Sequence, residues 1–236
     1  MEPYVVFAIL AFAAVGAIGW WSHVRKKRRR QDIASVAARY GFSHSPDDVS
    51  GILLNDFELL RRGDDRGCEN VVTGRWKGMP FSAADYWYYT ESTDKDGGTT
   101  RDYEHFSICV IDVPVDLPPL SVGRETFFSR AGGRLGLRDI EFESDEFNRR
   151  FQVRSDHRRF AYELIDTRMM LWLLSIDDRI GLELRGTKGL VYSRRLEPSE
   201  LVMLVGTGKE LLERLPRLVL KTYGSQGAAR EEAERA

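Results

Sequence analysis

Cysteine and histidine are scarce in this chain of 236 residues, which holds two cysteines and four histidines. A disulfide framework or a zinc site needs more of these residues at short spacing. Cys68 and Cys109 each lie inside an apparent strand, which favours a reduced pair of thiols. We therefore expect no metal and no cofactor.

Catalytic signatures are missing as well. The histidines form no HExxH pair, and no GxSxG turn offers a serine nucleophile. The segment VGTGKE holds Met203 and Glu210 where a phosphate loop requires Gly and Ser or Thr. The sequence predicts no catalytic residue, so an enzymatic role stays open but is less favoured than an interaction role.

A general excess of basic residues is also absent, because the formal net charge is -1. Six basic residues cluster at positions 25–30. Without this cluster and Glu2, the rest of the chain carries 29 basic and 35 acidic side chains, a net charge of about -6. Such a body lacks the basic footprint of a nucleic-acid binder. We expect no nucleic-acid partner.

One long apolar run stands at the beginning of the chain, from Tyr4 to Trp21. It contains no charge and no proline, and as a helix it covers about 27 Å, close to the thickness of a bilayer's hydrocarbon core. Tyr4 at one end and Trp20 with Trp21 at the other match the interfacial preference of aromatic rings. The run therefore predicts a single transmembrane helix.

The charges beside this run predict its direction. Glu2 precedes it, and a basic collar follows it, made of Arg25, Lys26, Lys27, Arg28, Arg29 and Arg30. A cleaved signal peptide has the opposite order, with basic residues first. Lys and Arg beside a span stay on the cytoplasmic side, so we expect the N-terminus outside and the body in the cytoplasm, at the plasma membrane. The lipid bilayer is then a partner, and anionic lipid headgroups are expected at the collar.

Three segments divide the chain on this basis. Residues 1–30 form the anchor with its collar, 31–224 a cytoplasmic α+β body with a possible sub-boundary near 114–124, and 225–236 a polar tail. Apolar residues at helical spacing predict helices over 32–40, 125–135 and 157–175, the last with a break at Asp166. A final helix is expected from Pro198 to Pro216.

The middle of the chain is expected to be β-rich. Residues 68–76 and 79–89 flank Lys77-Gly78 and predict a hairpin, and residues 103–113 add a third antiparallel strand. The prolines of 114–120 are expected to end this meander. Residues 179–185 and 189–196 predict a second hairpin around Gly186. The expected fold is thus α+β, with antiparallel hairpins and packed helices behind the transmembrane helix.

Two stretches offer candidate interaction residues. Tyr86, Trp87, Tyr88 and Tyr89 are consecutive in a strand, so either face carries aromatic surface. This pattern is typical of core packing on one side, but a groove for a ligand or partner is the alternative. The acidic block 139–146 puts Glu141 and Glu143 on one strand face. Its simpler interpretation is a solvated strand followed by a helix whose N-cap is Ser144.

The segment from Asp139 to Leu174 resembles a signature of an uncharacterised bacterial family of single-pass, membrane-anchored proteins, the DUF3137 type. The matching pattern FESxxFNRxFxV runs from Phe142 to Val153, and the strand pair from Glu69 to Tyr89 is similar to that of such proteins. The resemblance implies an architecture and transfers no catalytic residue.

Two function classes remain. The first is a membrane-tethered cytoplasmic interaction or scaffolding module that meets an unidentified protein partner. The alternative is a small-ligand sensor or enzyme that uses the aromatic strand 85–89 and the acidic block 139–146 as a pocket. That alternative requires several polar groups to converge on one concave site.

Overall fold

The computed structural model describes residues 3–48, 50–94, 97–124 and 139–224. Within the first helix, the side chains of 3–15, 17, 18 and 22 are outside the described part. The predicted helix over 125–135, the polar tail 225–236 and the predicted interfacial side chain of Tyr4 therefore lie outside the described residues.

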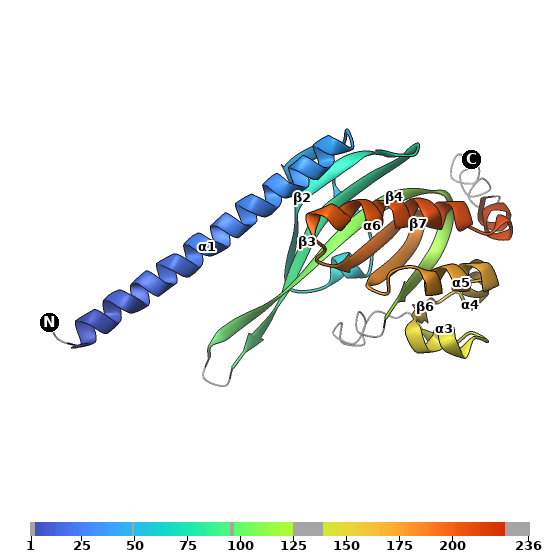
Figure 1. Cartoon of the computed structure of the whole chain (residues 1–236). Helices are drawn as coiled ribbons and strands as arrows, with labels where there is room; N and C mark the ends of the chain where they lie inside the picture. The colour runs from blue at the N-terminus through green and yellow to red at the C-terminus, as the bar shows by residue number, and fades with distance from the viewer. Residues whose placement is uncertain (1–2, 49, 95–96, 125–138, 225–236) are drawn as a thin grey trace, which may run out of the picture.

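The chain begins with α1, Pro3–Arg39, one uninterrupted helix of 37 residues that projects past the body (Figure 1). The predicted helix over 32–40 is its C-terminal part, and Gly41 with φ of 71° follows it. Among the side chains that are described, no helix combines the length and the apolarity that a membrane crossing requires. Most of the apolar run falls outside those side chains.

The body is built on a seven-stranded sheet in which all pairs are antiparallel. The order is β1-β2-β3-β4-β6-β5, and β7 also pairs with β4. The strands are β1 (Ser43–Asp47), β2 (Asp65–Trp76), β3 (Met79–Thr93), β4 (Thr99–Gly123), β5 (Asp139–Ile140), β6 (Gln152–Arg154) and β7 (Ile180–Arg194). The predicted mixed α+β class is confirmed.

The predicted β2–β3 hairpin is confirmed, with Trp76 paired to Met79 around the two turn residues. Lys77 and Gly78 have φ of 46° and 83°, the left-handed conformation that a two-residue hairpin turn requires. The third strand of the predicted meander is also confirmed, because β3 pairs with β4 from Phe81 opposite Ile111 to the loop at Thr93.

The prediction that the prolines of 114–120 end the meander is wrong. β4 continues through Pro114, Pro118 and Pro119 to Gly123. Its pairing with β3 ends at Ile111, and its pairing with β7 is interrupted between Asp112 and Leu117 and again before Leu120. Proline is tolerated at such irregularities, because no ladder hydrogen bond is required from it there. The possible sub-boundary at 114–124 thus lies inside a strand.

The predicted hairpin around Gly186 is wrong for a related reason. β7 is one continuous strand, and Gly186 with φ of 58° lies opposite Leu117, where β4 is irregular. Before this point Leu182 and Leu184 face the larger core, whereas after it Val191 does, so the alternation shifts by one residue. The turn-forming glycine therefore bends β7 together with β4.

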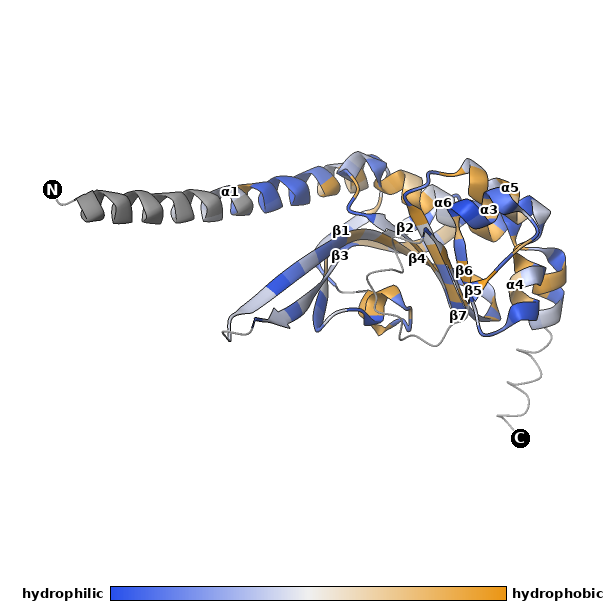
Figure 2. Cartoon of the chain, turned by 90° about the horizontal axis from the view of Figure 1, so that it is seen from below, coloured by the Kyte–Doolittle hydropathy of each residue, from blue (hydrophilic) through white to orange (hydrophobic). Residues whose placement is uncertain are grey.

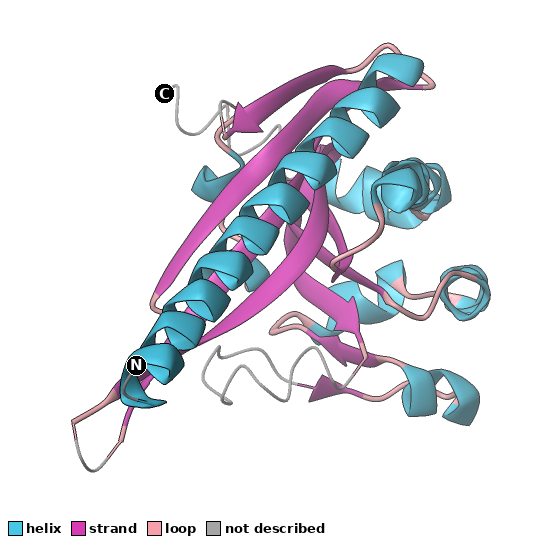
Figure 3. Cartoon of the chain, turned by 60° about the vertical axis from the view of Figure 1, so that its left-hand side comes forward, coloured by secondary structure: helices cyan, strands magenta, loops and turns pink. Residues whose placement is uncertain are grey.

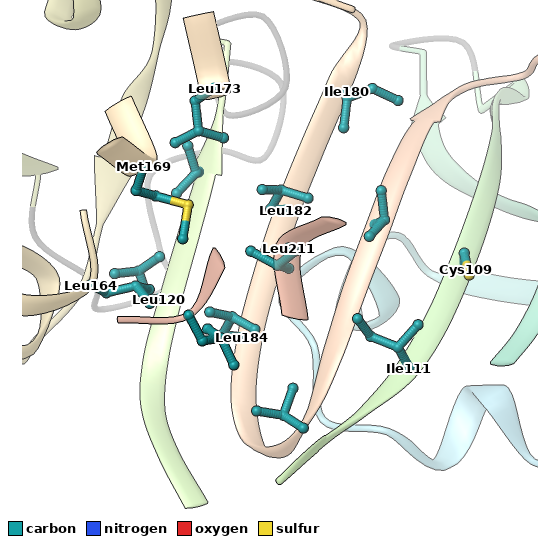
Figure 4. Close-up of a cluster of buried hydrophobic side chains, with 14 of the residues drawn as sticks. Cys109, Ile111, Leu120, Leu164, Met169, Leu173, Ile180, Leu182, Leu184 and Leu211 are labelled. Atoms are coloured by element: carbon teal, nitrogen blue, oxygen red, sulfur yellow. The ribbon is translucent and has the colours of Figure 1, made fainter. Parts of the chain in front are cut away.

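The sheet separates two hydrophobic cores. The larger core lies on the face covered by the C-terminal half of α1 and by the helices of the second half of the chain (Figures 2 and 3). Figure 4 shows part of it, with Leu164, Met169, Leu173 and Leu211 of the helices over Leu120 of β4 and Leu182 and Leu184 of β7. The smaller core lies on the other face under two short 3-10 turns, η1 (Ile52–Leu54) and η2 (Leu59–Arg61).

The covering helices begin and end where the sequence predicts. They are α3 (Asp145–Arg150), α4 (Arg158–Leu164), α5 (Thr167–Ser175) and α6 (Leu201–Arg214), with the turn η4 (Pro198–Glu200) before α6 and a helical segment at 217–224 after it. Ser144 accepts a hydrogen bond from the Phe147 amide at 3.3 Å, and Asp166 accepts one from the Met169 amide at 2.8 Å. Both predicted N-caps are confirmed.

The two glycines of VGTGKE have different surroundings in α6. A Cβ on Gly208 would lie 3.2 Å from Ile111 and 3.5 Å from Val191, so this glycine lets the helix approach the sheet closely. A Cβ on Gly206 would meet nothing within 4 Å.

A matched pair of variants tests this packing. Gly208→Leu should lower the free energy of unfolding by about 2 kcal/mol, because the added carbons overpack the helix–sheet contact. Gly206→Leu should be neutral or stabilising by up to about 1 kcal/mol, since leucine favours the helix and meets open space. Urea unfolding of both variants checks this, and equal effects would contradict the close approach at Gly208.

Candidate functional site

The C-terminal half of α1 is fixed to the sheet by a bidentate ion pair. Arg29 donates from Nε and Nη2 to the two carboxylate oxygens of Asp85 in β3, at 2.7 and 2.6 Å. Asp85 is only 5% exposed. Further along the helix, Ile33 and Ala37 are buried in the larger core. A planar, two-bond contact of this kind restrains direction as well as distance, so it sets the angle at which α1 leaves the body.

A β-bulge completes the surroundings of Asp85. The β2–β3 register shifts between Glu69 and Val72, and Asn70 there has φ of 57°. The Asn70 amide nitrogen donates to Asp85 at 2.9 Å, and the Arg195 guanidinium lies 3.6 Å from the same carboxylate. The buried negative charge therefore has three donor groups around it, as a buried carboxylate requires.

The basic collar is divided between two faces of α1. His23, Lys26, Lys27 and Arg30, with Gln31, line one wall of a cavity of about 470 Å³. The opposite wall consists of Glu69, Asn70 and Arg195. Positions 26, 30, 33 and 37 follow helical spacing, so the cavity opens where the buried face of α1 continues past the sheet contact. The collar was predicted as one cluster of six basic residues, and this spacing divides its members between different faces of the helix.

The other collar residues have different surroundings. Arg29 is the docking residue described above. Arg25 stacks over the ring of Trp21 at 5.0 Å, and neither Arg25 nor Arg28 lines the cavity. Trp20 and Trp21 are 73% and 64% exposed, so the body does not cover them.

The aromatic strand is divided in the same way. Tyr86 and Tyr88 are 1% and 5% exposed in the smaller core, and the Tyr86 hydroxyl donates to the Leu59 carbonyl at 3.1 Å. Trp87 and Tyr89 point to the opposite face, which is the α1 side because Asp85 shares it. Two of the four aromatic residues predicted as interaction surface, Tyr86 and Tyr88, thus belong to the core.

The outward half forms an aromatic ladder across β3 and β4, defined by Trp87, Tyr89, Tyr103 and His105. Ring centroids are 6.2 Å apart for Trp87–Tyr89, 5.2 Å for Tyr89–Tyr103 and 6.4 Å for Tyr103–His105. Tyr103 is 47% exposed. A Cβ on Gly67 of β2 would lie 2.8 Å from the Trp87 ring, so this glycine makes room for the indole.

The acidic block lies at a different part of the sheet. Asp139 accepts from Arg154 at 2.9 Å and from Gln152 at 2.7 Å, whereas Glu141 and Glu143 are exposed. β5 reaches β4 only through β6, at Ser121, fifteen residues along β4 from the Phe106 that pairs with Tyr86. The aromatic strand and the acidic block therefore do not converge on one pocket.

A buried pair of carboxylates was missed by the sequence reasoning. Glu183 is 3% exposed and accepts from the backbone amides of Glu58 and Leu59, at 2.5 and 3.0 Å, so it fastens η2 to the sheet. Glu58 is 7% exposed and accepts from Arg62 at 3.2 Å. Burial, followed by the charge of Glu58, raises the pKa of Glu183 to about 7. The sequence did contain a signal for this burial, because Glu183 is a single glutamate between two leucines, Leu182 and Leu184.

A larger cavity, of about 1350 Å³, opens at the end of the body near Gly186. Its walls come from 54–57, 116–119, 157–160, 185–188 and 222–223. Two of its cations are paired, Arg185 with Asp56 and Lys188 with Asp112. Its mixed and largely compensated charge indicates no particular ligand.

The described part of the chain contains no disulfide and no cluster of metal-binding side chains. Cys109 is fully buried, and burial raises the pKa of its thiol, while Cys68 lies in β2 as a free thiol. No group of three or more metal-binding side chains occurs among the described residues.

Comparisons with known proteins add a fold and no family. No protein-family model matches the chain, and no curated protein matches it. The resemblance to the DUF3137 type stays a prediction. A solved structure with a similar fold is that of the mycobacterial trehalose monomycolate transport factor A, TtfA, with a TM-score of 0.58 and 14% sequence identity. The alignment covers 80% of this chain and 96% of that one. At this identity the likeness shows the fold alone.

The docking of α1 can be tested by removing one partner of its ion pair. Arg29→Ala should lower the free energy of unfolding of the full chain in non-ionic detergent by about 3 kcal/mol, because Asp85 stays buried without its main counter-ion. Arg29→Ala with Asp85→Asn should recover part of this loss. Arg28→Ala, which removes a neighbouring collar charge, should change stability by less than about 0.5 kcal/mol. Urea unfolding measures all three, and equal effects of Arg29→Ala and Arg28→Ala would contradict the docking role.

The buried glutamate predicts a pH dependence. Because the pKa of Glu183 is higher in the folded than in the unfolded state, the folded chain holds a proton that the unfolded chain releases between about pH 4.5 and pH 7. Stability should therefore fall as pH rises through this window, by roughly 1.4 kcal/mol per pH unit. Glu183→Gln should remove this component, whereas Glu213→Gln, at an exposed site, should keep it. Urea unfolding at pH 5 and pH 7.5 decides, and an unchanged slope in Glu183→Gln would contradict the assignment.

Proposed function

We propose that this chain is a membrane-tethered interaction module, with its N-terminus outside, residues 4–21 across the plasma membrane and its body in the cytoplasm. The observation that carries the proposal is the continuous helix α1, docked through Arg29 and Asp85. A flexible linker would allow the body to change its position relative to the anchor. This contact instead holds one aromatic face of the body at a fixed position beside the anchor.

The composition and surroundings of α1 support the anchor. The run 4–21 holds no charge, and the exposed Trp20 and Trp21 stand at its end, as interfacial aromatic residues do. A helix of 37 residues is about 55 Å long, so it spans a hydrocarbon core of about 30 Å and still reaches the sheet. Arg25 and Arg28 remain as topology-determining charges, and the collar also attracts anionic lipid headgroups.

The partner surface that we propose is the aromatic ladder, which consists of Trp87, Tyr89, Tyr103 and His105. Beyond Tyr89, no other strand of the described residues lies beside β3 and β4, because β2 begins at Asp65, which is opposite Tyr89. This two-stranded ribbon projects from the body on the same side as α1 (Figures 1 and 3). Exposed tyrosine and tryptophan are enriched at protein interfaces, so the ladder suits a protein partner close to the membrane.

The structural likeness supports an accessory role. TtfA is a factor in trehalose monomycolate transport, and a shared fold makes a transport-associated protein partner our preferred choice for this chain. The alternative of a small-ligand sensor or enzyme has less support, because Tyr86 and Tyr88 belong to the core and Glu141 and Glu143 lie apart from them.

Site-specific photo-crosslinking in living cells tests the partner surface. Tyr103→p-benzoylphenylalanine should give a discrete protein adduct, since the ladder faces the partner. Tyr162→p-benzoylphenylalanine is the matched control, because Tyr162 is the same residue type with 44% exposure, near the acidic block. We expect no adduct from it. Adducts from Tyr162 alone would move the interface to the acidic end and contradict the proposal.

The orientation is checked in the same cells. A reporter that is active only in the cytoplasm, fused after Ala236, should be active, because the basic collar keeps the body inside. Export of the reporter would overturn the topology even if the crosslink formed.

A further inference from the structure

The cavity between α1 and the β2 bulge has a chemistry that the interaction proposal does not use. Four ionisable basic side chains, Lys26, Lys27, Arg30 and Arg195, line it together with His23. Three of them stand on the helix, and two of these, Lys26 and Arg30, continue the face that carries the buried Ile33. Cations usually occupy the solvent side of such a helix. Lys26 and Arg30 stay exposed although they continue the sheet-facing side of α1, so they are accessible to a negatively charged ligand at the mouth of the cavity.

Among the cations of this cavity, Arg195 has counter-ions in the described part of the chain, because it lies 3.6 Å from Asp85 and 3.9 Å from Glu69, whereas the cavity's cations on α1 have none there. No acidic side chain there forms an ion pair with Lys26, Lys27 or Arg30 at 4.0 Å or less. The wall contains one carboxylate, Glu69, whose nearest oxygen lies 3.9 Å from Arg195. The cavity therefore carries a net positive charge, and an anion with several acceptor oxygens suits it.

Asn70 adds a second and independent requirement. It lines the cavity and is 4% exposed, and its Oδ1 has no hydrogen-bond partner. The orientation of the amide is fixed, because its nitrogen donates to the Asp85 carboxylate. A buried acceptor without a donor costs free energy unless a ligand supplies the donor. The ligand should therefore carry a hydrogen-bond donor as well as a negative charge, and a neutral hydroxyl suits this cationic cavity better than an ammonium group.

The place of the cavity on α1 indicates where such a ligand comes from. His23 and Lys26 follow Trp21 within about one and a half helical turns, and these tryptophans mark the proposed membrane interface. Basic pockets beside membrane helices on the cytoplasmic side bind phosphate-containing lipid headgroups.

We propose that this cavity binds the headgroup of an anionic phospholipid with a polyol head, such as phosphatidylglycerol. Lys26, Lys27, Arg30 and Arg195 hold the phosphodiester, and Asn70 accepts from a headgroup hydroxyl. The inference rests on the proposed function in one respect, that α1 lies in a membrane. It assigns to the membrane-proximal end of the body a lipid-selective site in addition to the protein-binding ladder.

Native mass spectrometry of the full chain in non-ionic detergent tests the site. Titration with phosphatidylglycerol should show one saturable lipid per chain, while phosphatidylcholine should bind roughly tenfold more weakly, because its headgroup has no net charge and no hydroxyl. Phosphatidylserine should fall between the two. Equal binding of phosphatidylglycerol and phosphatidylcholine would overturn the proposal.

Two double variants separate the cavity from general attraction to the collar. Lys26→Ala with Arg30→Ala removes two charges from the cavity wall and should weaken binding of phosphatidylglycerol roughly tenfold or more. Arg25→Ala with Arg28→Ala removes two charges outside the cavity and should change it less than about twofold. Equal losses would show non-specific attraction and overturn the site. Circular dichroism confirms that both variants keep their fold.

Two further arms test the hydroxyl and the source of the phosphate. Asn70→Gly tolerates the positive φ, and it should remove the preference for phosphatidylglycerol over phosphatidylserine without abolishing binding of either. An unchanged preference would overturn the role of Asn70. Soluble glycerol 3-phosphate at millimolar concentration should not displace the lipid. Its displacement of the lipid would show a site for free phosphate esters and overturn the lipid assignment.

These outcomes are independent of those that test the proposed function. Binding in detergent needs neither a protein partner nor a particular topology. A chain that binds one phosphatidylglycerol but gives no crosslink from position 103 keeps the lipid site and loses the interaction module, and the reverse result does the opposite.

Discussion

The buried ion pair between Arg29 and Asp85 is the contact on which the arrangement of this molecule depends. The pair joins α1, which projects from the body, to Asp85 of β3 in the sheet. Beside this contact β2 has a bulge, and Asn70 of the bulge donates a hydrogen bond to Asp85. Removing either charge leaves the other without its counter-ion at a largely buried position. A single bidentate contact thus determines where the aromatic ladder lies relative to the anchor and keeps the basic cavity open beside it.

The different faces of α1 and of β3 carry residues with different roles. Consecutive residues in both α1 and β3 serve different purposes, because neighbours along a helix or a strand point in different directions. In β3, Tyr86 and Tyr88 support the smaller core while Trp87 and Tyr89 remain available on the α1 side. In α1, Arg29 docks, Lys26 and Arg30 line the cavity, and Arg25 stacks on Trp21. The consecutive basic residues of the collar therefore have three separate roles, which are docking to the sheet, lining the cavity and stacking on Trp21.

Much of the local structure was predictable from the sequence, because short-range rules govern it. The turn at Lys77-Gly78 and the caps at Ser144 and Asp166 depend on residues within a few positions of one another. The errors occurred where a distant partner decides. The prolines of β4 and the glycine of β7 each signal a chain break, yet Leu117 and Gly186 are paired, and the two irregularities compensate. Glu183 was overlooked for the same reason, since its partners Glu58 and Leu59 lie about 125 residues earlier.

The candidate site shows the same limit. Exposed tryptophans and a basic collar can be read from composition, but the cavity exists only because a helix from the beginning of the chain faces Arg195 near its end. Helical spacing distinguishes Lys26 and Arg30 from Arg25 and Arg28, whereas nothing in the sequence places Asn70 opposite them. The acidic block illustrates the converse, because Asp139 pairs with Arg154 and Gln152, and Asp145 and Glu146 lie in the first turn of the helix capped by Ser144.

The shared bend of β4 and β7 has a mechanical consequence. Both strands run through the whole body, so the half near α1 and the half under α4 and α5 are joined by the β4–β7 pairing, which resumes on either side of its irregularity at Asp112–Leu120. Both halves belong to one sheet, and a cut at 114–124 would open the larger core, to which Val115, Leu117, Leu120 and Val122 of this segment contribute. The body should therefore melt as one cooperative unit. A force applied along α1 would be transmitted from the Arg29–Asp85 contact to the far helices through main-chain hydrogen bonds. The body should therefore respond to such a force as one rigid unit.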